Sequence, residues 1–191
     1  LRGPLRHQSQ EVGRDGQEVA EQNRTNDAAA FTLMDMSTGR VVQINISHGG
    51  VPKLPVPSAR VTALGIDGDA HHDTKHHGGP NAAVCLFSIE VIDRLRAEGH
   101  PISPGSTGEN ITVQGLDWTG VTPGTRLSFA GGVELEVTHY TTPCSTIRNS
   151  FRELAFRRIQ QEDHPGQSRV YAKVVREGTV SINDQVTAHR S

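Results

Sequence analysis

The chain has 191 residues, which is enough for one domain with its own hydrophobic core, and a formal net charge of −2. That charge gives no overall attraction to nucleic acid or to an anionic lipid surface. No apolar run approaches the roughly 18 residues needed to cross a bilayer, and no secretory leader is visible. We therefore expect a cytoplasmic protein that binds neither nucleic acid nor membrane, with both of its cysteines reduced.

The beginning of the chain is expected to lie outside the fold. Residues 1–30 are mostly polar, charged or small, with no aromatic side chain and no apolar period. Such a segment cannot bury enough surface to offset the entropy lost on ordering it. We interpret residues 1–33 as a disordered extension or an expression-derived leader, and we place the folded domain at residues 39–188.

Short β-like runs separated by turn signals follow. Residues 40–47 alternate, with Val41, Gln43 and Asn45 on one face and Val42, Ile44 and Ile46 on the other. Further runs cover residues 59–65 and 81–87. Short strands at this spacing favour a mainly-β barrel or sandwich over a parallel α/β sheet.

Two hairpins are predicted in the second half of the chain. The first joins the runs at 125–130 and 133–140 through Gly131-Gly132, because paired glycines supply the positive φ that tight turns need. The second joins the runs at 169–175 and 179–184 through Glu177-Gly178.

Two helices are predicted at the periphery. The first covers residues 88–98, where Ser88 can cap the N-terminus and Gly99 provides the stop. The second covers residues 145–164, because Ile147, Phe151, Leu154 and Ile159 form an apolar stripe before Pro165-Gly166.

Four histidines and two glycines crowd residues 71–80, "HHDTKHHGGP", and three interpretations stay open there. A calcium loop starting at Asp67 is excluded, because His71 occupies its fifth position and no glutamate its twelfth. A solvated turn, a zinc site and an anion-binding loop remain. In the last of these, Gly78-Gly79 would let backbone N–H groups approach an anion beside the donors Lys75, His76 and His77.

The two cysteines are predicted to differ. Cys85 stands among apolar residues of a predicted strand and is expected to be a buried core residue. Cys144 lies between a strand and the second predicted helix, and a helix N-terminus favours the thiolate. A thiolate can bind a soft metal or attack an electrophile.

Four segments together resemble the MOSC domain, named for the C-terminal part of molybdenum-cofactor sulfurases, and are most similar to its small stand-alone bacterial members. They are "GIDGDAHHDTKHHGGPNAAVCLF", "GSTGENITVQGLDWTGVTPGTRLSF", "TTPCSTIRNSF" and "RVYAKVVREGTVSINDQV". The resemblance covers residues 39–188. It implies an antiparallel β-barrel with a few helices, bound to the molybdenum cofactor, a molybdopterin that carries the metal.

The same resemblance suggests roles for individual residues. Cys144 would be a sulfur ligand of molybdenum, and His77 a proton donor in catalysis. Glu109 is left open between a buried acid that partners a histidine and an exposed turn charge. The residues expected to hold the pterin or its phosphate are His76, His77, Gly78, Gly79, Asn110, Arg169 and Tyr171.

Three functions follow, in order of preference. The first is a reductase that converts N-hydroxylated bases, such as 6-N-hydroxylaminopurine, or related compounds to amines. Two cysteines cannot hold an iron–sulfur cluster, so its electrons would come from a separate flavin or iron–sulfur protein. The second is a cofactor-binding or sulfur-carrier protein with a persulfide on Cys144. The third is a barrel without cofactor whose histidines bind adventitious metal.

Overall fold

The structure is a computed structural model that describes Gly3, residues 36–70 and residues 79–189. The predicted extension over residues 1–33 lies outside the described residues, apart from Gly3. The strands are β1 (Met36–Ile46), β2 (Leu54–Val56), β3 (Ser58–Thr62), β4 (Gly65–Ile66), β5 (Val84–Ser88), β6 (Ile111–Gln114), β7 (Arg126–Phe129), β8 (Glu134–Tyr140), β9 (Val170–Arg176), β10 (Gly178–Ser181) and β11 (Gln185–His189). The helices are η1 (Pro80–Ala82), α2 (Ile89–Ala97), η2 (Trp118–Gly120), η3 (Ser145–Ser150), η4 (Arg152–Leu154) and η5 (Phe156–Ile159), where η marks a 3₁₀ helix.

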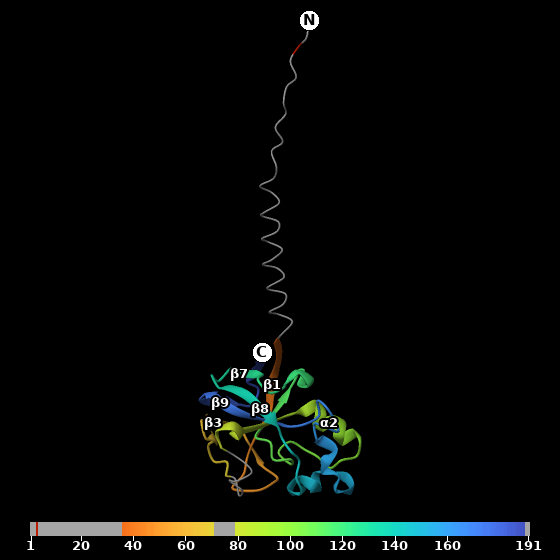
Figure 1. The fold of residues 1–191 in the computed structure, drawn as a ribbon. Helices are drawn as coiled ribbons and strands as arrows, with labels where there is room; N and C mark the ends of the chain where they lie inside the picture. The colour runs from red at the N-terminus through yellow and green to blue at the C-terminus, as the bar shows by residue number, and fades with distance from the viewer. Residues whose placement is uncertain (1–2, 4–35, 71–78, 190–191) are drawn as a thin grey trace. The chain divides into compact units, whose positions relative to one another are not determined.

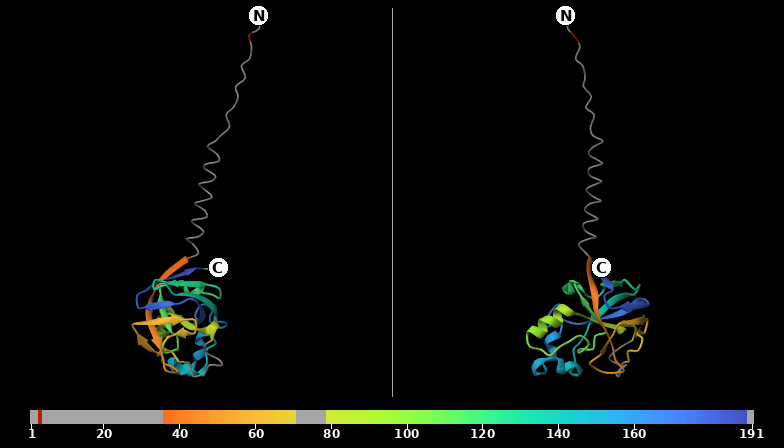
Figure 2. Two further views of the ribbon diagram at one scale, coloured as in Figure 1. Left: turned by 90° about the vertical axis from the view of Figure 1, so that its left-hand side faces the viewer. Right: turned by 180° about the vertical axis from the view of Figure 1, so that it is seen from behind.

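The main sheet closes into a barrel (Figures 1 and 2). Its strand order is β11-β7-β8-β9-β5-β6-β1-β2, and β11 also pairs with β1, so the first seven strands of this order form a ring. All of these neighbours are antiparallel except β5 and β6. A separate three-stranded sheet has the order β10-β3-β4. The predicted mainly-β barrel is confirmed.

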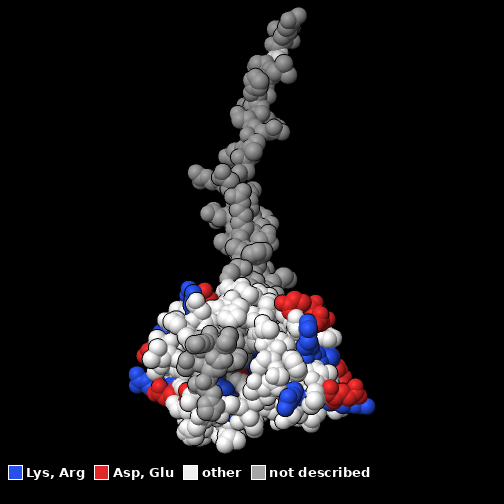
Figure 3. Space-filling model, turned by 60° about the horizontal axis from the view of Figure 1, so that its bottom comes forward, with Lys and Arg blue, Asp and Glu red and all other residues white. Residues whose placement is uncertain are grey.

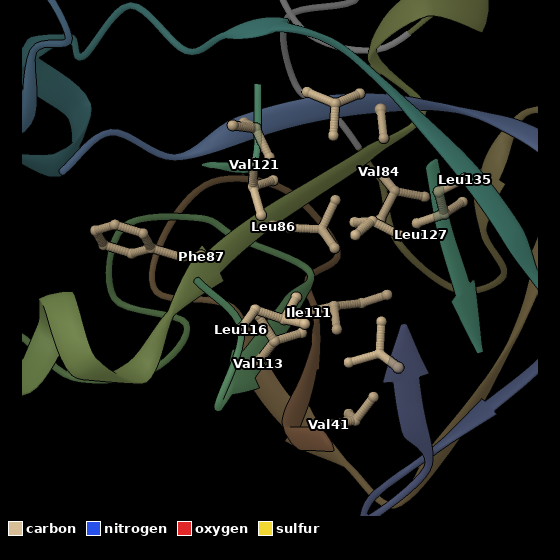
Figure 4. Packing of buried hydrophobic residues seen from close by; sticks show 14 of the residues in the cluster. Val41, Val84, Leu86, Phe87, Ile111, Val113, Leu116, Val121, Leu127 and Leu135 are labelled. Carbon is tan, nitrogen blue, oxygen red and sulfur yellow. The ribbon is translucent and has the colours of Figure 1, made fainter. Parts of the chain in front are cut away.

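Apolar side chains from the ring fill the barrel interior. Figure 4 shows Val41 of β1, Leu86 of β5 and Leu127 of β7 in one cluster, and each is fully buried. The strict alternation predicted for residues 40–47 is wrong. A β-bulge between Val41 and Gln43 shifts the register against β6, so Val41 and Ile44 are both buried in the core.

The first predicted helix is confirmed as α2. The Ser88 hydroxyl accepts hydrogen bonds from the backbone N–H groups of Glu90 and Val91, and Gly99 follows the helix with φ +89°. The apolar face, which includes Ile92 and Leu95, is buried. Because β5 and β6 are parallel, the chain must cross over between them, and α2 lies in that crossover. Within the described residues, no helix has the length and apolar character required to span a bilayer.

One predicted hairpin is confirmed and the other is wrong. β7 and β8 pair antiparallel around Gly132, which has φ +87°. Across Glu177, however, β10 does not pair with β9 and pairs instead with β3. The physical reason is that β9 ends at Arg176 and β10 begins at Gly178, so that Glu177 alone lies between them. The commonest tight hairpins need a loop of two residues, and a single residue does not let the chain fold back on β9.

The second predicted helix is also wrong, because residues 145–159 form the three short helices η3, η4 and η5. Phe151 has extended backbone angles, and Glu153 and Leu154 have positive φ. Burial nevertheless follows most of the predicted stripe, since Ile147, Phe151 and Ile159 are buried while Leu154 is exposed. Serine, threonine and asparagine in "STIRNS" weaken an α-helix, so tertiary contacts decide the local conformation.

These short helices lie beside α2, outside the barrel (Figures 1 and 2). The Arg158 guanidinium donates to both carboxylate oxygens of Glu98, at 2.9 and 2.7 Å. The backbone N–H of Arg152 donates to Nδ1 of His100 at 3.0 Å. These contacts join the α2 end to the segment that follows Cys144, so the helical side of the molecule supports one wall of the pocket described below.

Candidate functional site

A pocket of about 190 Å³ opens where the end of β8, the start of β9, strand β5 and the loop before β6 meet. Its wall combines two thiols, two cationic side chains, a phenol and an amide with several small residues. The residues that line it are Gly50, Val51, Lys53, Ala70, Cys85, Thr107, Gly108, Asn110, Thr142, Cys144, Thr146, Ile147, Arg169 and Tyr171. It therefore brings together Cys144, Asn110, Arg169 and Tyr171, four of the residues singled out in the sequence.

Cys144 supplies the accessible thiol of the pocket. It is partly exposed, forms no disulfide and occupies the N-cap position of η3. The expectation that Cys144 precedes an α-helix is wrong, because η3 is a 3₁₀ helix of six residues. The argument that a helix N-terminus favours its thiolate therefore loses its structural basis.

Cys85 supplies a second, buried thiol. It lies in β5 with 2% of its surface exposed, which confirms the prediction of a buried core residue. It also faces the pocket, which the sequence did not indicate. Burial raises the pKa of the Cys85 thiol to about 11, so this group stays protonated near neutral pH. Cys85 and Cys144 thus differ in access: one is buried and the other is partly exposed.

Arg169 is a buried cation with incomplete hydrogen bonding. Its side chain lines the pocket, only 6% of the residue is exposed, and Nη1 donates to the backbone carbonyl of Thr107. Nε has no hydrogen-bond partner among the described residues, and no described carboxylate forms an ion pair with the guanidinium. A buried guanidinium without a counter-ion is costly, and an anionic ligand at Nε would lower that cost.

Glu109 resolves the alternatives left open in the sequence, because it is neither a partner of a described histidine nor exposed. It is fully buried, and its Oε1 accepts a hydrogen bond from the backbone N–H of Gly105 at 2.6 Å. Its Oε2 accepts from the Thr107 hydroxyl at 2.7 Å, and the Thr112 hydroxyl donates to Oε1 at 3.4 Å. Glu109 therefore fixes the loop whose Thr107 carbonyl holds Arg169.

Asn110 connects three parts of the pocket wall. Its Oδ1 accepts a hydrogen bond from the Cys85 N–H at 3.1 Å, and its Nδ2 donates to the carbonyl of Asn45 at 3.3 Å and to Oδ2 of Asp69 at 2.8 Å. The amide is thus engaged by the protein on both its donor and its acceptor side. Its role in reading a pterin edge stays a prediction.

Lys53 and Asp69 form a buried ion pair that sequence reasoning missed as part of the site. Their side chains are 7% and 2% exposed, and Lys53 lines the pocket. Asp69 Oδ1 also accepts a hydrogen bond from the Ser47 N–H at 2.8 Å. No periodic pattern marks Lys53, and only its position between two prolines, in "PKLP", could have drawn attention to it.

Tyr171 lies opposite Cys85 in the register between β9 and β5. Its ring packs against His139, with centroids 5.3 Å apart and an angle of 40° between the planes. Burial raises the pKa of the Tyr171 phenol above its usual range, so the hydroxyl is protonated at neutral pH and can donate a hydrogen bond.

The histidine–glycine stretch falls mostly outside the described residues. His76, His77 and Gly78 are not described, and their roles stay predictions. Gly79 is described at the N-cap of η1, with φ +85° and open space where a Cβ would stand. Glycine is therefore required there for its backbone angle. Among the described residues, no group of three or more His, Cys, Asp or Glu side chains is arranged to bind a metal ion.

Charged residues of both signs surround the molecular face drawn in Figure 3. Lys and Arg alternate with Asp and Glu around its edge, and the described surface between them is mostly uncharged. On the part of that face that the structure describes, no broad patch of a single sign stands out.

A closed β-barrel with a pocket that contains the cysteine of Pro143-Cys144 characterises one class of protein, and comparison with known proteins identifies this class. The family model of the MOSC domain matches residues 73–187. The chain belongs to the MOSC domain family, which is associated with binding of the molybdenum cofactor. The resemblance found in the sequence is thereby confirmed.

Individual relatives support the same assignment. The uncharacterized protein YflK of Bacillus subtilis is 31% identical over 136 residues, which cover 69% of this chain and 59% of YflK. The crystal structure of YuaD from Bacillus subtilis matches with a TM-score of 0.64 and 20% identity, over 82% of this chain and 98% of YuaD. That of YiiM from Geobacillus stearothermophilus matches with a TM-score of 0.58 and 24% identity, over 78% of this chain and 74% of YiiM. At these identities the two structures support the fold alone.

Proposed function

We propose that this chain binds the molybdenum cofactor through the Cys144 pocket and reduces N-hydroxylated compounds to amines with electrons from a separate protein. The observation that carries the proposal is one pocket, in a MOSC-family chain, that holds both an accessible thiol and a buried, incompletely bonded guanidinium. The thiol suits a soft metal, and the guanidinium suits an anion.

The side chains of the pocket have the chemistry that the cofactor requires, but the pocket is large enough for only part of the cofactor. A thiolate at Cys144 is a soft ligand suited to molybdenum, and Arg169 Nε can donate to a phosphate oxygen of the pterin tail. Ligand sites commonly occupy about 300–1,000 Å³, whereas this pocket measures about 190 Å³. The described wall would therefore hold only part of the cofactor.

When bound, the cofactor supplies a metal centre that changes oxidation state and can take the oxygen of an N–OH group. The residues of this chain would bind the cofactor and orient it in the pocket. Cys144 would provide sulfur, Arg169 would provide positive charge, and Tyr171 would contribute its phenol to the pocket wall. His77 remains the candidate proton donor for the oxygen that leaves as water.

The electron donor is proposed to be a separate flavin or iron–sulfur protein. The chain contains only two cysteines, and they occupy different positions in the pocket wall, one buried and one accessible. An ordinary iron–sulfur cluster is held by four thiolates, so these two cysteines cannot hold a cluster that would deliver the electrons.

A second candidate is a sulfur carrier with a persulfide on Cys144. The observation that favours it is the contrast between the two thiols, since Cys144 is partly exposed and Cys85 is buried and protonated. Only the accessible thiol could accept and pass on a sulfur atom. This function would need no substrate turnover.

One experiment separates the two functions. The protein is purified from a host that makes the cofactor and is incubated with a chemical reductant and 6-N-hydroxylaminopurine. A reductase forms the amine, loses this activity in Cys144→Ser and keeps it in Glu134→Gln, whose exchanged side chain is on the barrel surface in β8. Cofactor without amine formation, together with a sulfur atom added to the Cys144 peptide in mass spectra, would favour the carrier.

A further inference from the structure

Glu109 carries a buried charge that the proposed function does not use. Its neighbours Thr107, Gly108 and Asn110 line the pocket, whereas Glu109 does not. Its side chain is fully buried behind this wall, held by the N–H of Gly105 and the hydroxyl of Thr107. A carboxylate is thus fixed behind the pocket that contains Cys144.

Thr107 links this carboxylate to Arg169 without an ion pair between them. The Thr107 hydroxyl donates to Glu109, and the Thr107 carbonyl accepts from Arg169 Nη1. Within the described chain, the Glu109 carboxylate and the Arg169 guanidinium form no ion pair, and Arg169 Nε lacks a partner. The negative charge therefore opposes the field of Arg169 from behind, while the donor group of Arg169 stays available to a ligand.

Two further buried charges of the described chain, Lys53 and Asp69, form an ion pair at the pocket. Lys53 and Asp69 are in direct contact, so their fields largely cancel at a distance. Burial is the main cause that raises the pKa of the Cys85 thiol; among the charges, Arg169 lowers this pKa and Glu109 raises it, with smaller effects from Lys53 and Asp69. Among the described residues, the potential inside the pocket is thus set chiefly by the balance between Arg169 and Glu109.

We propose that Glu109 is a specificity-determining residue whose fixed negative charge limits how strongly the Cys144 pocket favours anionic over neutral ligands. Without this charge, a buried guanidinium would attract any small anion. With it, an anion is favoured only if it also reaches Arg169 Nε and forms a hydrogen bond there. The inference rests on the Arg169 pocket of the proposed function but does not require a bound metal.

The test uses the reactivity of Cys144 as a probe of this potential. The full chain is made without cofactor, and the alkylation rate of Cys144 is measured with anionic iodoacetate and with neutral iodoacetamide by peptide mass spectrometry. Both reagents attack the same thiolate, so the ratio of the two rates cancels the thiolate fraction and reports charge. A general loss of order around Cys144 changes both rates together, and a displacement of Arg169 from the pocket would lower the ratio rather than raise it.

Glu109→Gln is expected to raise the iodoacetate-to-iodoacetamide ratio by about threefold to tenfold, as one unit charge removed at short range would do. Glu134→Gln, the same substitution at the far end of β8 from the pocket, is expected to leave the ratio unchanged. A ratio in Glu109→Gln that equals or falls below that of the wild type would overturn the proposal.

A second variant keeps the proposal testable if Glu109→Gln does not fold. In Arg169→Gln the charge of Glu109 is no longer opposed, so the ratio should fall below that of a free peptide spanning residues 138–152, which carries the same sequence around Cys144. A ratio equal to or above that of the peptide would contradict a role for Glu109. Since no cofactor is present, either failure is independent of whether the protein binds molybdenum.

Discussion

The buried Lys53–Asp69 pair offers a stability measurement whose size follows from burial. The two side chains are 7% and 2% exposed, and Asp69 also accepts hydrogen bonds from the Ser47 N–H and from Nδ2 of Asn110. The substitution Lys53→Met removes the cation that contacts the buried Asp69 carboxylate. Breaking a buried pair in this way costs about 3–5 kcal/mol of unfolding free energy.

Urea denaturation of the matched variants measures this cost. Lys173→Met breaks a pair with Glu136 whose side chains are 41% and 24% exposed, at a distance of 2.7 Å. That exposed pair is worth only about 0–1 kcal/mol. The double variant Lys53→Met/Asp69→Asn should lose less than the sum of its two single variants, because it removes both members of the contacting pair. If Lys53→Met and Lys173→Met lose the same free energy, the reasoning from burial is refuted.

Three further predictions concern thiol reactivity, backbone strain and pH. Near neutral pH a disulfide reagent should label Cys144 in the native protein and Cys85 only after unfolding or above about pH 10, since burial raises the pKa of Cys85 to about 11; rapid native labelling of both would contradict this. Gly65→Ala should lower the melting temperature and cost about 2 kcal/mol or more, because Gly65 has φ +121° and its Cβ would stand 2.7 Å from a backbone carbonyl oxygen; an unchanged melting temperature would count against it. The hydrogen bond from Arg158 holds the pKa of Glu98 below its usual 4.5, so this pair stabilises the fold at neutral pH and the stabilisation disappears as the pH falls below about 4.5. Since Glu98 is 38% exposed, the effect is below about 1 kcal/mol, and acid unfolding of Glu98→Gln should show a slightly smaller loss between neutral and acid pH than the wild type.

Local signals predicted those parts of the fold that depend on short-range chemistry. The Ser88 cap and Gly99 placed α2 correctly, and the glycine pair placed the turn between β7 and β8. The errors arose where distant parts of the chain decide the structure. The partner of β10 is β3, which is distant in the sequence, and the bulge in β1 depends on its pairing with β6.

The candidate site shows the same division. Motif order brought Cys144 and Arg169 to attention, and the structure places both in one pocket. Lys53 and Cys85 were missed as pocket residues, because a lysine between prolines and a cysteine in an apolar strand carry no sequence sign of the cavity they face. The sequence also did not show that Glu109 is buried or which groups it hydrogen-bonds, because both depend on the folded chain.

Direct measurement of bound molybdenum and pterin tests the central claim. The wild-type protein and Cys144→Ser are purified from a host that makes the cofactor, and both contents are determined per chain. The account predicts that the wild type carries cofactor and that Cys144→Ser carries much less molybdenum. A wild type with neither molybdenum nor pterin would contradict cofactor binding, and equal molybdenum in the two proteins would contradict the ligand role of Cys144.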